Sequence, residues 1–472
     1  MTTLTQHTGT PASGTGNSDA PTTTTTPAAT PADQSENTTS ENAASENSAA
    51  TVDDATAAAV DTIADAAKAA SRVLARADRA TKDAALRAIG AALIANQDRI
   101  LAANERDLAD ADANGVSTSL QDRLRLTTER IAGLAEALEN LASLPDPVGS
   151  VVRGQTLPNG LRLRQVHVPL GVVGAIYEAR PNVTVDIAGL ALKAGNAVIL
   201  RGGTAAQHSN AALVELIGEA LNAQGLPDTA VQTIDEYGRA GANALMRARG
   251  KVDVLIPRGG RSLIQTVVRN AQVPVIETGE GNVHIFVDAS ASPEMVTPIV
   301  VNAKTQRPST CNTVETLLVH PGFTGLESTL RALAEAGVRL HVDERVAAAL
   351  PADLPTQPAT EEDWATEYID LDLAVATVDT LDEAIEHIEK YTTRHTEAIL
   401  TNDLANAERF VAEVDAAAVL VNASTRFTDG GEFGLGAEVG ISTQKMHARG
   451  PMGLTELTTT KWIVTGDGHV RP

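Results

Sequence analysis

The chain has 472 residues, enough for two or three domains that each bury a core, and 43% of its residues are hydrophobic. Its formal net charge of −23 argues against a nucleic-acid-binding protein, and no apolar run reaches the roughly 18 residues of a membrane-spanning helix. Cys311 is the one cysteine, so no disulfide can form within the chain, and we expect a free thiol in a reducing cytoplasm.

Residues 1–52 are predicted to be a disordered, acidic, low-complexity tail. They are rich in Thr, Ser and Pro and contain no Lys, Arg or aromatic residue. Such a segment cannot bury enough apolar surface to offset its chain entropy. We therefore expect it to take no part in the chemistry.

A helical region and a first α/β series follow the tail. Apolar residues recur every three or four positions between 55 and 144, which predicts helices, and the alternation over 147–168 around Asn159-Gly160 predicts a β-ribbon. Strands then alternate with helices, which predicts a parallel sheet with helices on both faces. The expected strands are 171–176, 196–200, 230–234, 252–256 and 273–276.

A second α/β series runs from 283 to about 420. Its expected strands are 284–288, 314–320, 373–378, 397–400 and 418–422, and a last β-like segment covers 461–464. Two such series predict an α/β protein with two Rossmann-like parallel sheets.

Cys311 lies in a polar segment, although a lone cysteine is ordinarily a small buried hydrophobe. Lys304 and Arg307 precede it, and neighbouring cations favour the nucleophilic thiolate. Residues 308–310 read as a turn or a helix entry, where backbone N–H groups would also favour the anion. Cys311 is therefore the leading candidate for a catalytic nucleophile.

Two glycine loops follow predicted strands of the first series, where parallel sheets bind ligands. Arg201-Gly202-Gly203 places an arginine suited to the 2′-phosphate that distinguishes NADP from NAD. Arg258-Gly259-Gly260 opens a helix whose N-terminus suits a phosphate. The alternative interpretation is two ordinary glycine turns with solvated arginines.

The polar loop after the strand at 418–422 is suited to an amino-acid head group through Arg426, Asp429 and hydroxyls such as that of Thr425. The ten histidines show no metal-ligand spacing, so no metal is expected.

Three segments, GVVGAIYEARPNVTVDIAGLALKAGNAVILRGG (171–203), NAKTQRPSTCNTVETLLVH (302–320) and the loop and tail over 421–462, carry a resemblance. They resemble the gamma-glutamyl phosphate reductases, the proline-pathway family of the aldehyde dehydrogenase superfamily. The resemblance implies an NADP-binding domain over 53–275, with the 147–168 ribbon serving oligomerisation. It also implies a catalytic domain over 276–445, and a segment over 446–472 that returns to the cofactor domain and ribbon.

The resemblance implies reduction of L-glutamyl 5-phosphate by NADPH to L-glutamate 5-semialdehyde and phosphate, through a thioester on Cys311. Asn182 is the favoured oxyanion donor besides the Cys311 N–H, and Arg180 is the alternative and a substrate ligand. Lys304 or Arg307 would bind the leaving phosphate, or else be surface charges. Glu367 aligns with a glutamate that holds the nicotinamide ribose.

Two rival functions stay open. A hydrolytic aldehyde dehydrogenase would need Glu277 or Glu280 to activate water at the thioester. A non-catalytic scaffold would instead be a partner of glutamate 5-kinase. The expected partners are thus the substrate, glutamate 5-kinase and further copies of the chain, with no nucleic acid and no membrane.

Overall fold

The computed structural model describes residues 54–471, so the tail predicted over 1–52 lies outside the described residues. Five helices open the described part, as the apolar spacing predicted. Their ends are set by local side chains: Asp78 accepts the N–H of Thr81, and Thr127 accepts that of Arg130. The helices are α1 (Asp54–Leu74), α2 (Arg79–Ala95), α3 (Gln97–Ala113), α4 (Thr118–Leu124) and α5 (Thr128–Ser143).

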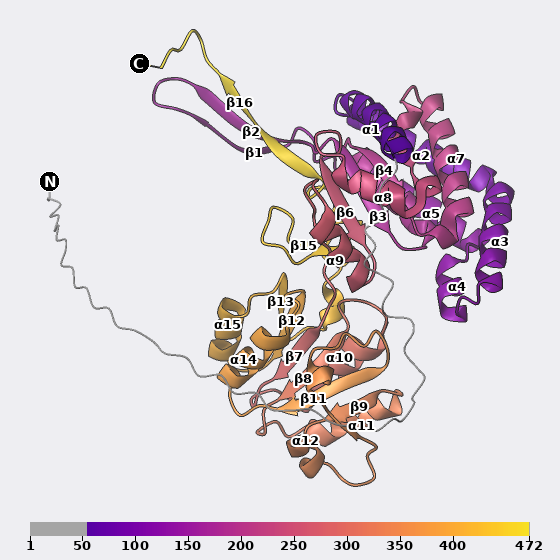
Figure 1. Cartoon of the computed structure of the whole chain (residues 1–472). Coiled ribbons are helices and arrows are strands. Elements are labelled where there is room, and N and C mark those ends of the chain that lie inside the picture. The colour runs from indigo at the N-terminus through magenta and orange to yellow at the C-terminus, as the bar shows by residue number, and fades with distance from the viewer. Residues whose placement is uncertain (1–53, 472) are drawn as a thin grey trace, which may run out of the picture. The chain divides into compact units, whose positions relative to one another are not determined.

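The predicted ribbon is a three-stranded antiparallel sheet of β1 (Val151–Thr156), β2 (Arg162–Pro169) and β16 (Thr458–Thr465), in the order β1-β2-β16. Gly160 turns between β1 and β2 with φ 91°, which favours glycine. β16 pairs with β2 along its whole length, so the last strand of the chain lies beside residues 162–169 (Figure 1).

The first parallel sheet has the order β5-β4-β3-β6. Its strands are β3 (Val172–Tyr177), β4 (Ala197–Arg201), β5 (Val231–Thr233) and β6 (Val254–Arg258). Its helices are α6 (Pro181–Lys193), α7 (Gln207–Ala223), α8 (Gly238–Arg247) and α9 (Arg261–Asn270), with 3₁₀ turns η1 (Thr204–Ala206), η2 (Asp228–Ala230) and η3 (Asp235–Tyr237).

The prediction of a strand at 273–276 is wrong. This segment makes one bridge to β6, in which Leu255 donates to the carbonyl of Pro274 at 2.8 Å and accepts from Ile276 at 2.9 Å. Pro274 has no N–H to continue a ladder, so the segment pairs at a single point on the edge of the sheet.

The second parallel sheet has the order β10-β9-β11-β8-β7-β12-β13. Its strands are β7 (Val283–Val287), β8 (Val314–Val319), β9 (Arg339–Val342), β10 (Gln357–Pro358), β11 (Asp372–Thr377), β12 (Thr396–Leu400) and β13 (Ala418–Val421). Its helices are α10 (Pro293–Thr305), α11 (Leu326–Glu335), α12 (Glu344–Ala349), α13 (Glu361–Trp364), α14 (Leu381–Tyr391) and α15 (Leu404–Glu413). The short strands β9 and β10 are additions to the prediction.

Alternating residues of this sheet enter two separate cores. Ile285 and Val287 of β7 pack on the face covered by α10, α11 and α12, whereas Phe286 packs on the face covered by α14 and α15. Successive side chains of a strand point to opposite faces, so a continuous apolar run serves both layers of helices. Figure 1 shows these helix groups on either side of the strands.

The end of the chain joins the core of the first sheet. That core takes most of its residues from 60–276 and adds a group from the C-terminal part: Val439, Ala448, Met452, Leu454 and Leu457. The short strands β14 (Ile441–Ser442) and β15 (Gly450–Pro451) pair within this part, after the 3₁₀ turn η4 (Thr425–Phe427). The fold is therefore α/β with two Rossmann-like parallel sheets. No helix within residues 54–471 is long and apolar enough to cross a membrane.

Candidate active site

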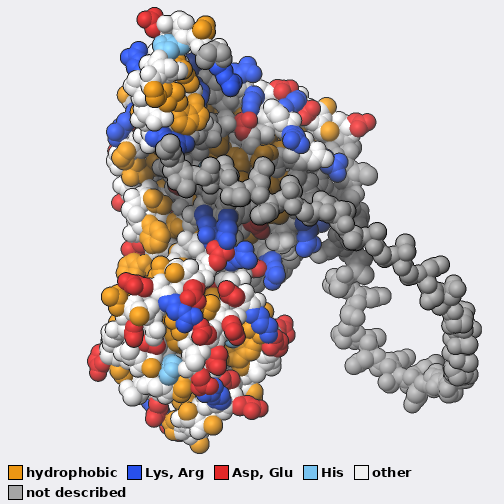
Figure 2. Space-filling view, turned by 90° about the vertical axis from the view of Figure 1, so that its left-hand side faces the viewer, with side chains coloured by type: hydrophobic (Ala, Val, Ile, Leu, Met, Phe, Trp, Pro, Cys, Tyr) orange, Lys and Arg blue, Asp and Glu red, His pale blue; other side chains and the backbone are white. Residues whose placement is uncertain are grey.

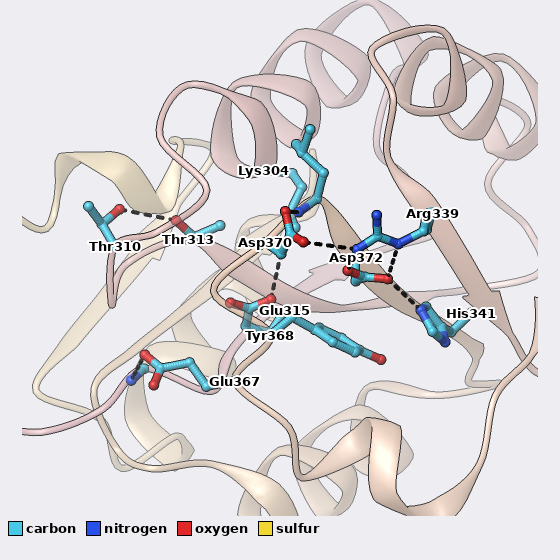
Figure 3. Close-up of polar contacts among 12 residues, drawn as sticks. Lys304, Thr310, Thr313, Glu315, Arg339, His341, Glu367, Tyr368, Asp370 and Asp372 are labelled. Atoms are coloured by element: carbon cyan, nitrogen blue, oxygen red, sulfur yellow. Dashed lines mark hydrogen bonds and ion pairs between the residues drawn. The ribbon is translucent and has the colours of Figure 1, made fainter. Parts of the chain in front are cut away.

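Cys311 is partly accessible and lies in the turn between α10 and β8, so the turn predicted at 308–310 is confirmed and the helix entry is not formed. Its turn is tied on both sides. The hydroxyls of Thr310 and Thr313 each donate to the carbonyl of Arg307 at 2.9 Å, and they contact each other (Figure 3). Asn312 donates to the carbonyl of Thr428 at 2.9 Å, which joins the turn to the segment that follows β13.

Gly281 packs directly against the cysteine. A Cβ atom on Gly281 would lie 1.4 Å from the carbonyl oxygen of Cys311, so a side chain has no room here. The N–H of Gly281 donates to Oε1 of Glu367 at 2.8 Å (Figure 3). Gly281 therefore packs against the backbone of Cys311 and also fixes the carboxylate of Glu367 through its N–H.

A cavity of about 520 Å³ opens beside Cys311, between this turn and the carboxyl ends of β3 and β6. Six arginines line it: Arg123, Arg180, Arg258, Arg261, Arg307 and Arg426. Five carboxylates also line it: Glu178, Glu280, Glu367, Asp429 and Glu438. Figure 2 shows Lys and Arg side chains gathered near the middle of one face, although the chain as a whole carries −23.

The carboxylates of the cavity bind mostly backbone N–H groups rather than arginines. Glu438 accepts from Gly430 at 2.8 Å and Asp429 accepts from Gly431 at 2.8 Å. Arg261 alone among the six pairs with an acid, Glu280, at 3.2 Å. Within residues 54–471, the other five arginines form no ion pair, which leaves their charge for a ligand.

Burial raises the pKa of the Cys311 thiol to about 12, and the charges of Glu367 and Glu438 act in the same direction. Arg258 is the cation that opposes the shift. The expectation that Lys304 and Arg307 favour the thiolate is thus corrected: the low-dielectric wall and two carboxylates outweigh the cation nearby. The thiol stays protonated at neutral pH in the absence of a ligand.

Lys304 is not placed to meet a substrate. Its ammonium lies 2.6 Å from Oε2 of Glu315 on β8, and neither side chain exposes any surface (Figure 3). Burial lowers the pKa of Lys304 and raises that of Glu315 to about 8. The Tyr368 ring lies 5.7 Å from the ammonium. The assignment of Lys304 to the leaving phosphate is therefore corrected, because α10 turns this side chain into the interior.

Other predicted residues divide between the cavity and its surroundings. Arg180, at the start of α6, lines the cavity, whereas Asn182, two residues later, is exposed and donates to Asp186 at 3.1 Å. The loop after β13 brings Arg426 and Asp429 to the wall, but Thr425 is fully buried. The structure thus does not place Asn182 or Thr425 on the cavity wall.

The residues at the end of β4 lie outside this cavity. The N–H of Gly202 donates to Oδ1 of Asp235 at 2.7 Å, and a Cβ on Gly203 would lie 2.5 Å from the backbone nitrogen of Ala179. Gly202 and Gly203 thus allow close contact with Asp235 and Ala179 of the same chain, and not with a ligand. Arg201, beside them, is half-buried.

The glycine loop after β6 is part of the cavity wall. The N–H of Gly260, expected to serve a phosphate, donates to Oε1 of Glu178 at 2.6 Å. A Cβ on Gly259 would lie 2.7 Å from the same carboxyl group. Arg258 donates to the carbonyl of Val439 at 3.3 Å and faces the cavity. A carboxylate of the chain therefore occupies the start of α9.

Glu277 and Glu280 were the two candidates for activating water at the thioester. Neither has an unengaged carboxylate beside Cys311. Glu277 contacts Gln265 at 3.3 Å and Gln444 at 3.5 Å and lines a second cavity of about 200 Å³. Glu280 lines the cysteine cavity but pairs with Arg261. Among the described residues, no group of three His, Cys, Asp or Glu side chains is arranged to hold a metal ion.

Three residues of the site escaped the sequence analysis: Arg123, Gly281 and Glu438. Arg123 belongs to a short helix far from Cys311 in the chain, with no local pattern that marks a ligand. Gly281 and Glu438 matter through tertiary contacts alone, and a single sequence holds no signal for them.

The chain combines three features: two Rossmann-like sheets, a cysteine in the cavity between them, and an antiparallel ribbon that includes the last strand. Together these features are typical of the aldehyde dehydrogenases. The chain matches the aldehyde dehydrogenase family over residues 30–349 and 373–463 and is a member of it. That membership implies a nicotinamide cofactor.

Closer relatives narrow the class. The gamma-glutamyl phosphate reductase of Kineococcus radiotolerans is 61% identical over 416 residues, which cover 88% of this chain and 96% of that protein. The gamma-glutamyl phosphate reductase of Leifsonia xyli is 62% identical over 408 residues, covering 86% and 96%. The crystal structure of the Thermotoga maritima gamma-glutamyl phosphate reductase matches with a TM-score of 0.85 at 47% identity, covering 88% of this chain and 100% of that one. This chain belongs to the gamma-glutamyl phosphate reductase family.

Proposed function

We propose that the protein reduces L-glutamyl 5-phosphate with NADPH, giving L-glutamate 5-semialdehyde and phosphate, as the second step of proline biosynthesis from glutamate. The observation that carries this proposal is the cavity at Cys311, which is lined by five arginines that form no ion pair within residues 54–471. An acyl phosphate supplies an electrophilic carbon for the thiol and negative charge for these five arginines. The names of the close relatives support the same reaction.

Cys311 carries the acyl group in this proposal. Its sulfur attacks the acyl carbon, a C–S bond forms, and the C–O bond to phosphate breaks with its electron pair on oxygen. The thiol proton leaves with the phosphate, so no separate base is required. This route suits a thiol whose pKa burial raises to about 12, because its proton is lost only as the phosphate departs.

The Cys311 N–H is the proposed donor for the oxyanion. Arg180 lines the cavity, whereas the amide of Asn182 is engaged with Asp186 outside it. We therefore keep Arg180 as a proposed substrate ligand and do not retain Asn182 as an oxyanion donor. The exposed Arg307 remains a proposed phosphate ligand. The half-buried Arg426, which the sequence assigned to the amino-acid head group, is now proposed for the phosphate as well, because it contacts Thr310 beside Cys311.

NADPH is the proposed cofactor, and when bound it would supply hydride to the thioester carbon. The C–S bond then breaks with its electron pair on sulfur, the aldehyde is released, and the sulfur takes up a proton from solvent to restore the thiol. Arg201 fits its 2′-phosphate: the guanidinium is half-buried, donates to the Gly238 carbonyl at 3.4 Å, and forms no ion pair within the described chain. Burial lowers the pKa of Arg201 against the charge of Asp235, and the charge of Arg239 adds to the lowering. Glu367 is proposed to hold the nicotinamide ribose, because it lines the cavity beside Cys311.

The reverse reaction tests the proposal directly. We expect purified protein to reduce NADP⁺ with L-glutamate 5-semialdehyde only when inorganic phosphate is present. Equal turnover without phosphate would instead support the hydrolytic aldehyde dehydrogenase, and no turnover would support the scaffold. Cys311→Ser is expected to abolish turnover while the circular dichroism spectrum and melting temperature stay unchanged; retained activity would exclude the thioester.

The ribbon is proposed to join copies of the chain. β16 is an edge strand, and it exposes 47% of Trp462 and 56% of Val464. Unpaired edge strands with exposed apolar side chains invite pairing with another chain. Light scattering is expected to show an oligomer that Trp462→Lys/Val464→Lys dissociates. Association with glutamate 5-kinase and a cytoplasmic location remain predictions.

A further inference from the structure

We infer that the cavity holds two separate anion subsites: one on Arg426, beside Cys311, for phosphate, and one on Arg123 and Arg180 for the α-carboxylate of the substrate. The inference rests on the proposed function, since it assigns the two ends of that substrate. Arg123 becomes a specificity-determining residue, which no local sequence pattern marks.

The first subsite is built on the turn that carries the nucleophile. Arg426 donates from Nε to Gln306 at 2.7 Å and from Nη1 to the hydroxyl of Thr310 at 2.7 Å. Thr310 immediately precedes Cys311. A guanidinium has five N–H groups, so three remain for an anion. These contacts fix Arg426 where a group leaving the acyl carbon would be.

The second subsite comes from the other side of the cavity. Arg180 lies at the start of α6 and Arg123 on α4, two elements of the N-terminal part. Burial lowers the pKa of Arg180, and Arg123 is the next largest cause. Neither is among the charges that act most strongly on Cys311. Two guanidinium groups from α4 and the start of α6 thus act on each other within the cavity, and they belong to elements other than the turn that carries Cys311.

Such a pair is costly without a ligand. Arg258 and Arg307 add to the repulsion at Arg180, and the carboxylate that opposes it, Glu178, already accepts the N–H of Gly260. Among the described residues, neither Arg123 nor Arg180 forms an ion pair. A carboxylate that binds the guanidinium groups of both Arg123 and Arg180 would remove this repulsion and form charge-assisted hydrogen bonds.

The substrate has the matching arrangement of charge. Its phosphate sits on one end of a short carbon chain and its α-carboxylate on the other. With the acyl carbon at Cys311 and the phosphate at Arg426, the α-carboxylate points to the far wall. A simple acyl phosphate lacks this second anion and leaves Arg123 and Arg180 unpaired, so the cavity selects an amino-acid derivative.

The reverse reaction separates the two subsites, because semialdehyde and inorganic phosphate are then independent substrates. We would measure KM for each, and for NADP⁺, in Arg123→Met and Arg426→Met. Arg123→Met is expected to raise the KM of the semialdehyde about 10- to 100-fold and that of phosphate by less than about twofold. Arg426→Met is expected to give the opposite pattern. Arg123→Lys keeps the charge and is expected to recover part of the lost affinity.

Arg125→Met is the matched control. Arg125 lies next to α4, is exposed and does not line the cavity, so its loss should change no KM. Equal effects of Arg123→Met on both substrates, an effect on phosphate alone, or an effect mainly on NADP⁺ would each overturn the two subsites. Melting curves show whether the variants are folded. A wild-type protein with no phosphate-dependent turnover would instead overturn the proposed function, and this assignment with it.

Discussion

Lys304 and Glu315 form an ion pair of 2.6 Å in which neither side chain has any solvent exposure. The pair lies beside Tyr368 and Asp370 (Figure 3). The N–H of Ile369 also stabilises the Glu315 carboxylate. Ile369 lines the cavity with φ 56°, a conformation that costs a β-branched residue energy. The buried pair therefore holds the strained segment that carries Glu367.

Removing one partner of this pair should be more damaging than removing both. Lys304→Met leaves the Glu315 carboxyl group buried without its partner, and we expect it to lower the free energy of unfolding by about 3–5 kcal/mol. Lys304→Met/Glu315→Leu removes both charges and should recover most of that loss. Urea denaturation measures both. A double variant no more stable than the single one would contradict this account.

Gly281→Ala should abolish activity. Its Cβ would overlap the Cys311 carbonyl, so the backbone of the cysteine or of Gly281 must move, and we expect turnover to fall at least about 100-fold. Gly133→Ala is the control, because Gly133 lies exposed in α5 with open space around it. That change should stabilise the protein by about 0.5–1 kcal/mol. Normal activity in Gly281→Ala would refute the close contact.

Cys311 should react slowly with alkylating agents in the free enzyme. Burial raises its pKa to about 12, so little thiolate exists at pH 8, and labelling should increase as pH rises through 8–10. Since Cys311 is the one cysteine, mass spectrometry of iodoacetamide-treated protein reports it alone. Glu438→Gln removes a charge that raises this pKa and should speed labelling. Rapid labelling of the wild-type protein at pH 7 would contradict the expectation.

Arg201→Gln should change cofactor preference rather than turnover. Loss of a charge-assisted contact to the 2′-phosphate is expected to raise the KM of NADPH about 10-fold or more and leave that of NADH unchanged. Steady-state kinetics with each cofactor measures this. A parallel rise in both values would mean that Arg201 supports the fold and not the phosphate.

His387 should make the protein less stable in acid. Burial lowers its pKa to about 3, with His284 adding to the shift, so the ring stays neutral when folded and protonates near its ordinary pKa of 6.5 when unfolded. The unfolded state then binds more protons between pH 6.5 and 3, and stability falls as pH falls through that window. One such group contributes about 1.4 kcal/mol per pH unit.

His387→Phe tests this slope. The ring packs against Trp364 and Tyr391, so Phe keeps the aromatic contacts. Urea denaturation from pH 4 to 6.5 should show a shallower loss of stability. His395, whose pKa burial lowers to about 4, still contributes, so the slope should decrease and not vanish. An unchanged slope would exclude His387 as a cause.

Several features of the site follow from the sequence. The spacing of apolar residues correctly predicted three elements of the site. They are the strand before the loop with Arg426, the strand after Cys311 and the glycine loop after β6. Such patterns are local, because alternation and the three- to four-residue spacing express the geometry of a single element. The error at 273–276 has a local cause too: an apolar run that contains Pro274 cannot continue a ladder.

The sequence by itself determined the α/β class, the family resemblance and the one candidate nucleophile, because periodicity, motif identity and a lone cysteine are readable without folding. Tertiary structure alone decided which charges meet Cys311. It turned Lys304 inward onto Glu315 and brought Arg123 from a distant helix to the cavity. The reason is physical: the direction of a side chain depends on what its element packs against, and burial converts that direction into an ion pair, a raised pKa or an unpaired charge for a ligand.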